Sequence, residues 1–251
     1  MFRLSRRRLL ALMLAPGLVA MTAAPAARAS WWPFSPQTLR ALTRRPDASG
    51  LSTAEIIEAV HEALIIATHS ATETLAQRNG YYGNPDVRIP LPEVLATARR
   101  SLDRIGMATP LTRLEELMNR AAEAAIPEAR EPLVRAIFAL DLENAREILA
   151  GPDDAATRHL EQHARADVTE AMRAPVQLSL EQVEALDTYR ELEQRMREIP
   201  FLARVRFDPV EHVLEHTIDG LFFMLAEEEG RLRANPQGRG TDVLQRVFRR
   251  Q

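Results

Sequence analysis

Cysteine is absent from this chain, which excludes disulfide bonds, thiolate metal sites and cysteine nucleophiles together. Only ten glycines are present, and because most stand where helices are expected to end, they offer no phosphate cradle. The Gly-x-Ser-x-Gly motif, the P-loop and the glycine-rich dinucleotide turn are also missing. The sequence therefore contains no common nucleophile or nucleotide motif, and it predicts no bound cofactor.

The formal net charge of −3 hides an uneven distribution of charge along the chain. Residues 1–29 hold five of the 32 basic residues and no acidic residue, so the remainder has 27 basic against 35 acidic residues and a net charge near −8. An acidic surface repels nucleic-acid backbones and anionic membrane surfaces. We therefore expect no nucleic-acid partner.

The first 29 residues have the three parts of an export signal: a basic part at 3–8, an apolar part at 9–20, and the small-residue cleavage site Ala27-Arg28-Ala29. The run Ser5-Arg6-Arg7-Arg8-Leu9-Leu10 resembles the twin-arginine export pattern, with an arginine-rich secretory leader as the alternative. The apolar part is short for a membrane span, which needs about 20 residues. We predict cleavage after Ala29, a periplasmic location, and no transmembrane helix once the signal is removed.

Residues 30–50 have the composition of a linker, with Trp31-Trp32-Pro33-Phe34 followed by a polar stretch that contains two further prolines. Residues 51–251 are predicted to form one all-helical domain, since about 220 mature residues suffice for a compact core. This domain is organised around a helix at about 208–233, in which apolar residues recur at helical spacing along one broad stripe.

Capping and breaker residues delimit the other helices. Ser52 and Glu55 form a capping box at the start of the first long helix. Residues 81–92 contain Pro85, Pro90 and Pro92, so this segment is predicted to be extended or to form a short strand. The remaining helices are expected at 92–105, 111–125, 127–140, 142–149, 154–172, 180–197 and 241–248. The predicted fold class is all-α, an irregular single-domain bundle of about eight helices with one Pro-rich extended connection.

Several runs resemble one known family. They are Asn84-Pro85 with Val87 to Pro92, Met118 to Glu123, Gly151 to Thr157, Asp219 to Glu229, and Asn235-Pro236. In this order, across about Leu51 to Phe248, they resemble a bacterial family of exported all-helical proteins classed as domain of unknown function 4197. The resemblance implies a single helical, envelope-facing domain and no assigned activity. A lipoprotein cysteine associated with many members is missing here, so membrane anchoring does not carry over.

Glu228 is the polar residue that fits its predicted surroundings least well. It falls within the apolar stripe of the 208–233 helix, where an unpaired carboxylate costs on the order of several kcal/mol. Arg88 and Arg120 are candidate partners. A buried ion pair, the polar floor of a ligand pocket and exposure at the helix end are the open interpretations. We expect Glu228→Gln to destabilise the fold more than the same change at Glu227 or Glu229.

The helix at 111–125 carries polar residues opposite its apolar stripe. Asn119 and Glu123 lie there, and Glu116 and Arg120 have the spacing of a surface ion pair. This face is either solvated or, because asparagine is a poor helix former, a second packing or recognition face. We assign no catalytic residue, and the candidate binding residues are Arg88, Asn119, Arg120, Glu123 and Glu228.

Two histidine pairs with a spacing of four, His159 with His163 and His212 with His216, have the geometry of metal ligands on helices. The second pair lies opposite the apolar stripe of its helix, and the Glu-x-x-His spacing of di-iron bundles is missing. We therefore predict no native metal site.

These observations favour a non-catalytic binding or interaction protein of the periplasm over an enzyme. A cleft beside the Pro-rich segment and the 208–233 helix would hold an apolar small molecule or a segment of a partner protein. One alternative is a carboxylate- or metal-dependent periplasmic enzyme that uses Glu228 with Glu123 or Asp154. A structural envelope component is the other alternative, and fold class alone does not decide among the three.

Overall fold

The computed structural model describes residues 51–104, 106, 108–140, 143, 145–200, 205–235 and 241–248. The predicted export signal and linker lie outside these residues. Within them the chain forms helices around one hydrophobic core and no strand, which confirms the predicted all-α class. The helices are α2 (Thr53–Ala76), α3 (Glu93–Asp103), α4 (Ala108–Ala125), the 3-10 turn η1 (Ile126–Ala129), α5 (Arg130–Ala139), α6 (Ala145–Ala150), α7 (Ala155–Gln182), α8 (Ala185–Arg197), α9 (Pro209–Ala234) and α10 (Asp242–Phe248).

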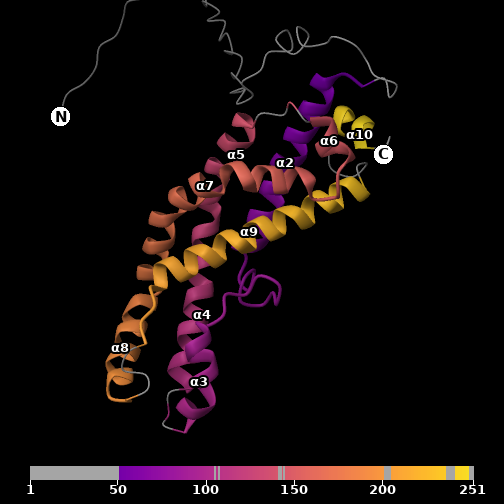
Figure 1. The fold of residues 1–251 in the computed structure, drawn as a ribbon. Coiled ribbons are helices and arrows are strands. Elements are labelled where there is room, and N and C mark those ends of the chain that lie inside the picture. The colour runs from indigo at the N-terminus through magenta and orange to yellow at the C-terminus, as the bar shows by residue number, and fades with distance from the viewer. Residues whose placement is uncertain are drawn as a thin grey trace, which may run out of the picture.

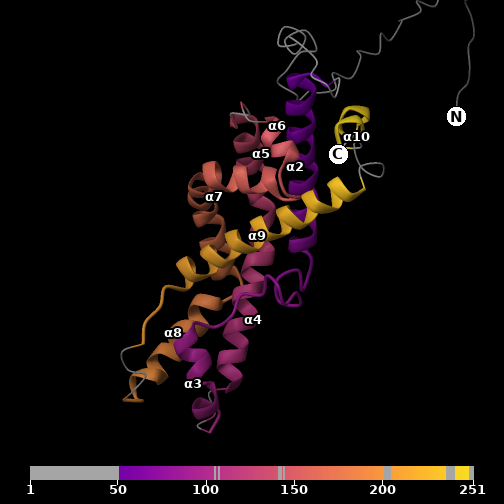
Figure 2. The same ribbon diagram turned by 45° about the vertical axis from the view of Figure 1, so that its right-hand side comes forward.

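The molecule is elongated, with α3 and α8 at one end and α5, α6 and α10 at the other (Figures 1 and 2). Helix α9 runs obliquely across α2, α4 and α7 and connects the two ends. Helices α7 and α9 lie antiparallel, because Arg165 pairs with Asp219 while Arg173 Nη1, further along α7, donates to Glu211, which is earlier on α9 (2.5 Å).

The ends of the two long helices α2 and α9 are fixed by local capping. Ser52 Oγ accepts the Glu55 N–H (3.2 Å), and Glu55 Oε2 accepts the Ser52 N–H (3.0 Å), so the predicted capping box is confirmed. At the start of α9, Asp208 Oδ1 accepts the N–H groups of Val210 (2.9 Å) and Glu211 (3.2 Å). Pro209 occupies the first helical position, where the lack of an N–H costs nothing.

Helix α7 continues through Pro175, so the predicted helix end near Met172 and the predicted start of the next helix at Leu180 are wrong. Proline removes one backbone hydrogen bond from a helix interior. Here Val168, Met172, Val176 and Leu180 recur every four residues and are all completely buried. The burial of this stripe offsets the lost bond and keeps the helix intact.

The Pro-rich segment 81–92 forms turns and extended chain rather than a strand. It lies against α9, where the Tyr81 hydroxyl donates to the carbonyl of Thr217 (2.8 Å). A Cβ at Gly220 would come within 2.8 Å of Tyr81 Cε1 and 3.1 Å of Val87 Cβ. The segment and the helix are therefore in close contact at Gly220.

Candidate functional site

The polar face of α4 is covered by the Pro-rich segment, which makes it the packing face that the sequence left as an alternative. Asn119 is completely buried, and its side-chain amide accepts the N–H of Ile89 (2.9 Å) and donates to the carbonyl of Ile89 (2.8 Å). The same amide nitrogen also donates to the carbonyl of Glu115 (2.8 Å). Asn119 therefore bonds the backbone of Ile89 as a neighbouring strand would.

One turn further along α4, Glu123 fixes the start of the same segment. Its Oε1 accepts the backbone N–H groups of Tyr81 (3.2 Å) and Tyr82 (3.1 Å), and its Oε2 accepts Nη1 of Arg120 (2.7 Å). Arg120 also pairs with Glu116 (3.5 Å), as predicted, and donates to Asn79 Oδ1 (2.8 Å). A buried carboxylate is tolerated here because it receives three hydrogen bonds, one of them from a cation.

Arg88 lies on the outer side of the segment. Its Nε donates to Glu115 Oε1 (3.1 Å), and its guanidinium lies 4.3 Å from the ring centre of Tyr82. The guanidinium of Arg120 lies 5.3 Å from the same ring centre. Arg88, Asn119, Arg120 and Glu123 are thus brought together around one segment, through cation–π contacts and backbone hydrogen bonds.

Glu228, the fifth candidate, lies in a different part of the molecule. It is buried as expected, but its ion-pair partner is Arg231 on the same helix, so the expected pairing with Arg88 or Arg120 is wrong. The neighbouring Glu229 is buried more deeply and forms the central pair with Arg233 (2.8 Å).

Glu229, on α9, caps the start of α7. Asp154 is the N-cap of α7, yet its side chain makes no capping bond. Instead, Glu229 accepts the N–H groups of Ala156 (3.0 Å) and Thr157 (2.7 Å). A carboxylate at this end of a helix is also favoured by the helix dipole.

Beside the covered face of α4 there is an open groove of about 620 Å³ between the end of α2, α4 and the turn from α7 to α8. We call it the α4 groove. Arg120 and Glu123 belong to its wall, so it adjoins the cluster around Tyr82. Its other lining residues are Ala76, Arg78, Arg113, Glu116, Leu117, Ala124, Gln182, Val183 and Glu184.

Glu184, which sequence reasoning did not single out, has a left-handed backbone conformation with φ of 61° and ψ of 22°. This conformation costs a residue with a Cβ roughly 1–2 kcal/mol. The only other non-glycine residue with positive φ in the described part of the chain is Asn79, the hydrogen-bond partner of Arg120. Glu184 therefore lines the α4 groove, and Asn79 contacts Arg120, another of its lining residues.

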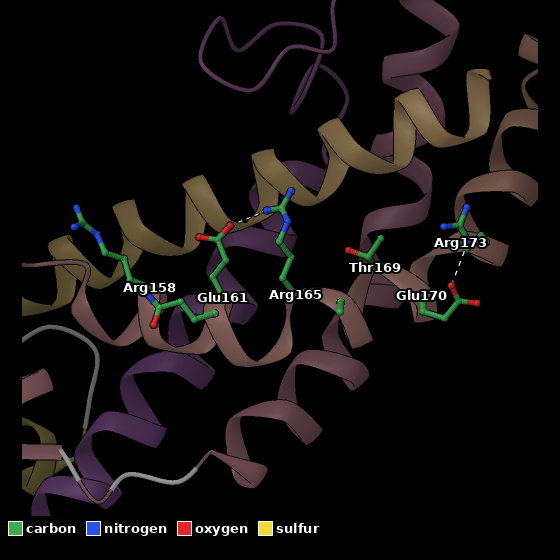
Figure 3. Close-up of a pocket in the computed structure, with 8 residues that line it drawn as sticks. Arg158, Glu161, Arg165, Thr169, Glu170 and Arg173 are labelled. Carbon is green, nitrogen blue, oxygen red and sulfur yellow. Dashed lines mark hydrogen bonds and ion pairs between the residues drawn. The ribbon is translucent and has the colours of Figure 1, made fainter. Parts of the chain in front are cut away.

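A second open groove, of about 750 Å³, lies along α7 (Figure 3). Three arginines line it, and each is already paired: Arg158 with Asp154, Arg165 with Glu161 and Arg173 with Glu170. Figure 3 shows the last two pairs running along the helix. We call it the α7 groove, and its charges are neutralised within the molecule.

The histidine pairs are parts of helix surfaces. The ring centres of His159 and His163 lie 4.3 Å apart. Nε2 of His212 donates to the carbonyl of Pro90 (2.8 Å), and burial lowers the pKa of His212 despite this bond, with His216 adding to the effect. No group of three or more histidine, cysteine, aspartate or glutamate residues suited to a metal ion occurs among the residues described.

The carboxylates considered for catalysis each contact other groups of the protein. Glu123 holds the Pro-rich segment, Asp154 Oδ2 accepts Nε of Arg158 (2.8 Å), and Glu228 pairs with Arg231. In the part of the chain that the structure covers, no helix is long and apolar enough to cross a membrane.

The fold and the groove thus define a single all-α domain with an open, charged hollow on one face. A family model described as "Protein of unknown function (DUF4197)" matches residues 50–249, and the chain belongs to this family. The resemblance carried by the sequence runs is confirmed. No curated protein and no solved structure matches the chain.

Proposed function

We propose that this chain is an exported, periplasmic, non-catalytic binding protein and that the α4 groove is its binding site. The observation that carries the proposal is the conformation of Glu184. A glycine at this position would adopt φ of 61° without steric cost. The glutamate side chain makes no hydrogen bond or ion pair with the described residues, so fold stability gives no reason for its presence. Strained residues of this kind cluster at functional sites.

The size and lining of the groove are consistent with a ligand site. Its volume falls within the range of about 300–1,000 Å³ that is typical of ligand pockets. Leu117, Ala124 and Val183 supply apolar surface, and charged side chains surround it. We therefore revise the expected small-molecule ligand from an apolar molecule to one that carries charged groups as well. Periplasmic location rests on the sequence pattern of residues 1–29 alone.

Native mass spectrometry tests both the export of the protein and the binding of a ligand. The protein is purified gently from the compartment to which its own leader sends it. We expect a polypeptide mass that begins at Ser30 and a reproducible added mass from the bound ligand. Ala124→Trp fills the α4 groove from an exposed helix position and should abolish the added mass. Ala166→Trp is the matched control, because Ala166 is likewise exposed and lines the α7 groove.

Comparison of the wild type with the Ala124→Trp and Ala166→Trp variants distinguishes the possible results. Loss of the added mass only in Ala124→Trp supports the site. An added mass that survives Ala124→Trp, or that disappears only in Ala166→Trp, refutes the α4 groove as the site. A bare polypeptide mass in every preparation refutes ligand binding, and a chain that retains residues 1–29 refutes signal removal.

A further inference from the structure

The α4 groove contains one positive and one negative side chain that have no partner among the residues that the structure describes. Arg78 follows the end of α2, and Glu184 precedes α8. Both line the groove, and neither forms an ion pair or a hydrogen bond through its side chain with any residue in the described ranges. These two are held by separate elements and remain unpaired.

The other charges of the groove cancel within it. Glu116 pairs with Arg113 (3.7 Å) and Arg120 (3.5 Å), and Glu123 pairs with Arg120 (2.7 Å). Glu123 has in addition committed Oε1 to two backbone N–H groups. A ligand thus meets one available cation and one available anion rather than a field of one sign.

Apolar side chains also line the groove. Leu117 contributes from α4, and Val183 from the turn before α8. The complementary ligand has an apolar body, a negative group for Arg78 and a positive group for Glu184. Arginine is well suited to a carboxylate, which it binds through two parallel hydrogen bonds.

We propose that the α4 groove binds a short zwitterionic peptide, with the terminal carboxylate on Arg78 and the terminal ammonium on Glu184. This rests on the proposed function, since it names the ligand class of the same groove. A groove of about 620 Å³ has room for a peptide of a few residues. Glu184 then has a reason to remain glutamate at a position that favours glycine, because glycine would leave the ammonium group without a partner.

The test is calorimetric titration with alanyl-leucyl-alanine, compared with its N-acetylated and its C-amidated forms. Against the wild-type chain, blocking either terminus should weaken binding at least about tenfold, because each block removes a charge-assisted contact. In Arg78→Gln, the free and amidated peptides should bind equally, while acetylation still weakens binding. In Glu184→Gln, acetylation should have no effect, while amidation still weakens binding.

This crossed pattern depends on each charge recognising one terminus, and a general loss of folding would not produce it. Both side chains are exposed and unpaired, so both variants should melt within about 2 °C of the wild type, as is usual for surface substitutions. Equal binding of all three peptides to the wild type, or a sensitivity to end-blocking that neither variant changes, overturns the proposal. So does the absence of binding.

The two proposals can fail separately. If Ala124→Trp removes a native added mass while the tripeptide does not bind, the groove is the site and only the ligand class is wrong. If the added mass persists in the Ala124→Trp variant, the α4 groove is not the binding site. Binding of the tripeptide that Ala124→Trp leaves unchanged would place the peptide elsewhere and overturn the assignment to Arg78 and Glu184.

Discussion

Replacement of Glu229 by glutamine should be among the most damaging single changes in this protein. Glu229 is completely buried, and its two oxygens accept five contacts. Thr157 supplies two of them, from its N–H and its hydroxyl (both 2.7 Å), and Arg233 supplies two more, from Nε (2.9 Å) and Nη2 (2.8 Å). Glutamine keeps the shape but replaces one acceptor with an NH₂ group, which meets donors on either side.

The size of the stability loss depends on Arg233, which Glu229→Gln leaves buried without a negative partner. Arg233 is itself buried and also donates to the carbonyls of Leu149 (3.0 Å) and Ile148 (3.1 Å) at the end of α6. Removing one partner of a buried ion pair costs about 3–5 kcal/mol, because the other charge stays buried. For a domain of about 200 residues this corresponds to a fall in Tm of roughly 6–20 °C.

Thermal unfolding followed by circular dichroism measures the effect, with Glu227→Gln as the matched control. The Glu227 side chain is 53% exposed and lies 4.0 Å from Arg231, so its loss should change stability by less than about 1 kcal/mol. We expect Glu228→Gln to fall between the two, which reverses the order predicted from sequence for the adjacent positions 228 and 229. A Glu229→Gln protein that melts within about 2 °C of Glu227→Gln would refute the reasoning.

A double-mutant cycle with Arg233→Met separates the ion pair from helix capping. Glu229 links the start of α7 to α9, while Arg233 links the end of α6 to α9. If the two charges depend on each other, the double mutant should be more stable than the sum of the single losses allows, by at least about 1 kcal/mol. Strict additivity would mean that each residue acts only through its own backbone contacts.

Three further predictions concern single positions. Burial lowers the pKa of His61 from 6.5 to about 4. The folded chain therefore keeps His61 neutral while the unfolded chain protonates it, so the free energy of unfolding is unaffected above pH 6.5 and falls as the pH decreases toward 4. Relative to His61→Leu, wild-type stability in urea titrations should decline by roughly 3 kcal/mol over this range, and parallel pH profiles would contradict this. Gly220→Ala gains up to about 1 kcal/mol of helix propensity but forces Cβ into Tyr81 and Val87, so the Tm should fall; an unchanged or higher Tm would show that the contact relaxes. Glu184→Gly should leave the Tm unchanged or raise it while weakening ligand binding, and a clear loss of stability would give Glu184 a structural role instead.

Local signals were sufficient to predict most of the helices. The capping box at Ser52 and the Asp208-Pro209 start of α9 depend on residues a few positions apart, and both appear as the sequence indicates. The end of α7 was mispredicted because Pro175 is a local signal, whereas the burial of Val176 and Leu180 depends on neighbouring helices. Local capping residues thus determine where helices start, whereas tertiary packing determines whether a helix continues through a residue such as Pro175 that would otherwise end it.

The polar clusters were harder to predict, because their partners lie far away in the sequence. Asn119 looked unsuited to a helix interior, and the reason is Ile89, thirty residues earlier, whose backbone it bonds on both sides. Glu228 and Glu229 belong to a run of three glutamates, and helical periodicity placed Glu228 on the apolar stripe. The structure adds that Glu229 faces the start of α7, a contact over more than seventy residues that no local pattern encodes.

The contrast between Glu229 and Glu184 indicates where function should be sought in this fold. Glu229 has every acceptor engaged inside the protein, so its presence is explained by stability. Glu184 has no partner for its side chain among the described residues, and its backbone conformation favours glycine. The unfavourable backbone conformation of Glu184 is the reason for which we propose that its exposed carboxylate contacts a ligand. Arg78, which has no side-chain partner among the described residues either, lines the same α4 groove, and we propose that the ligand binds there.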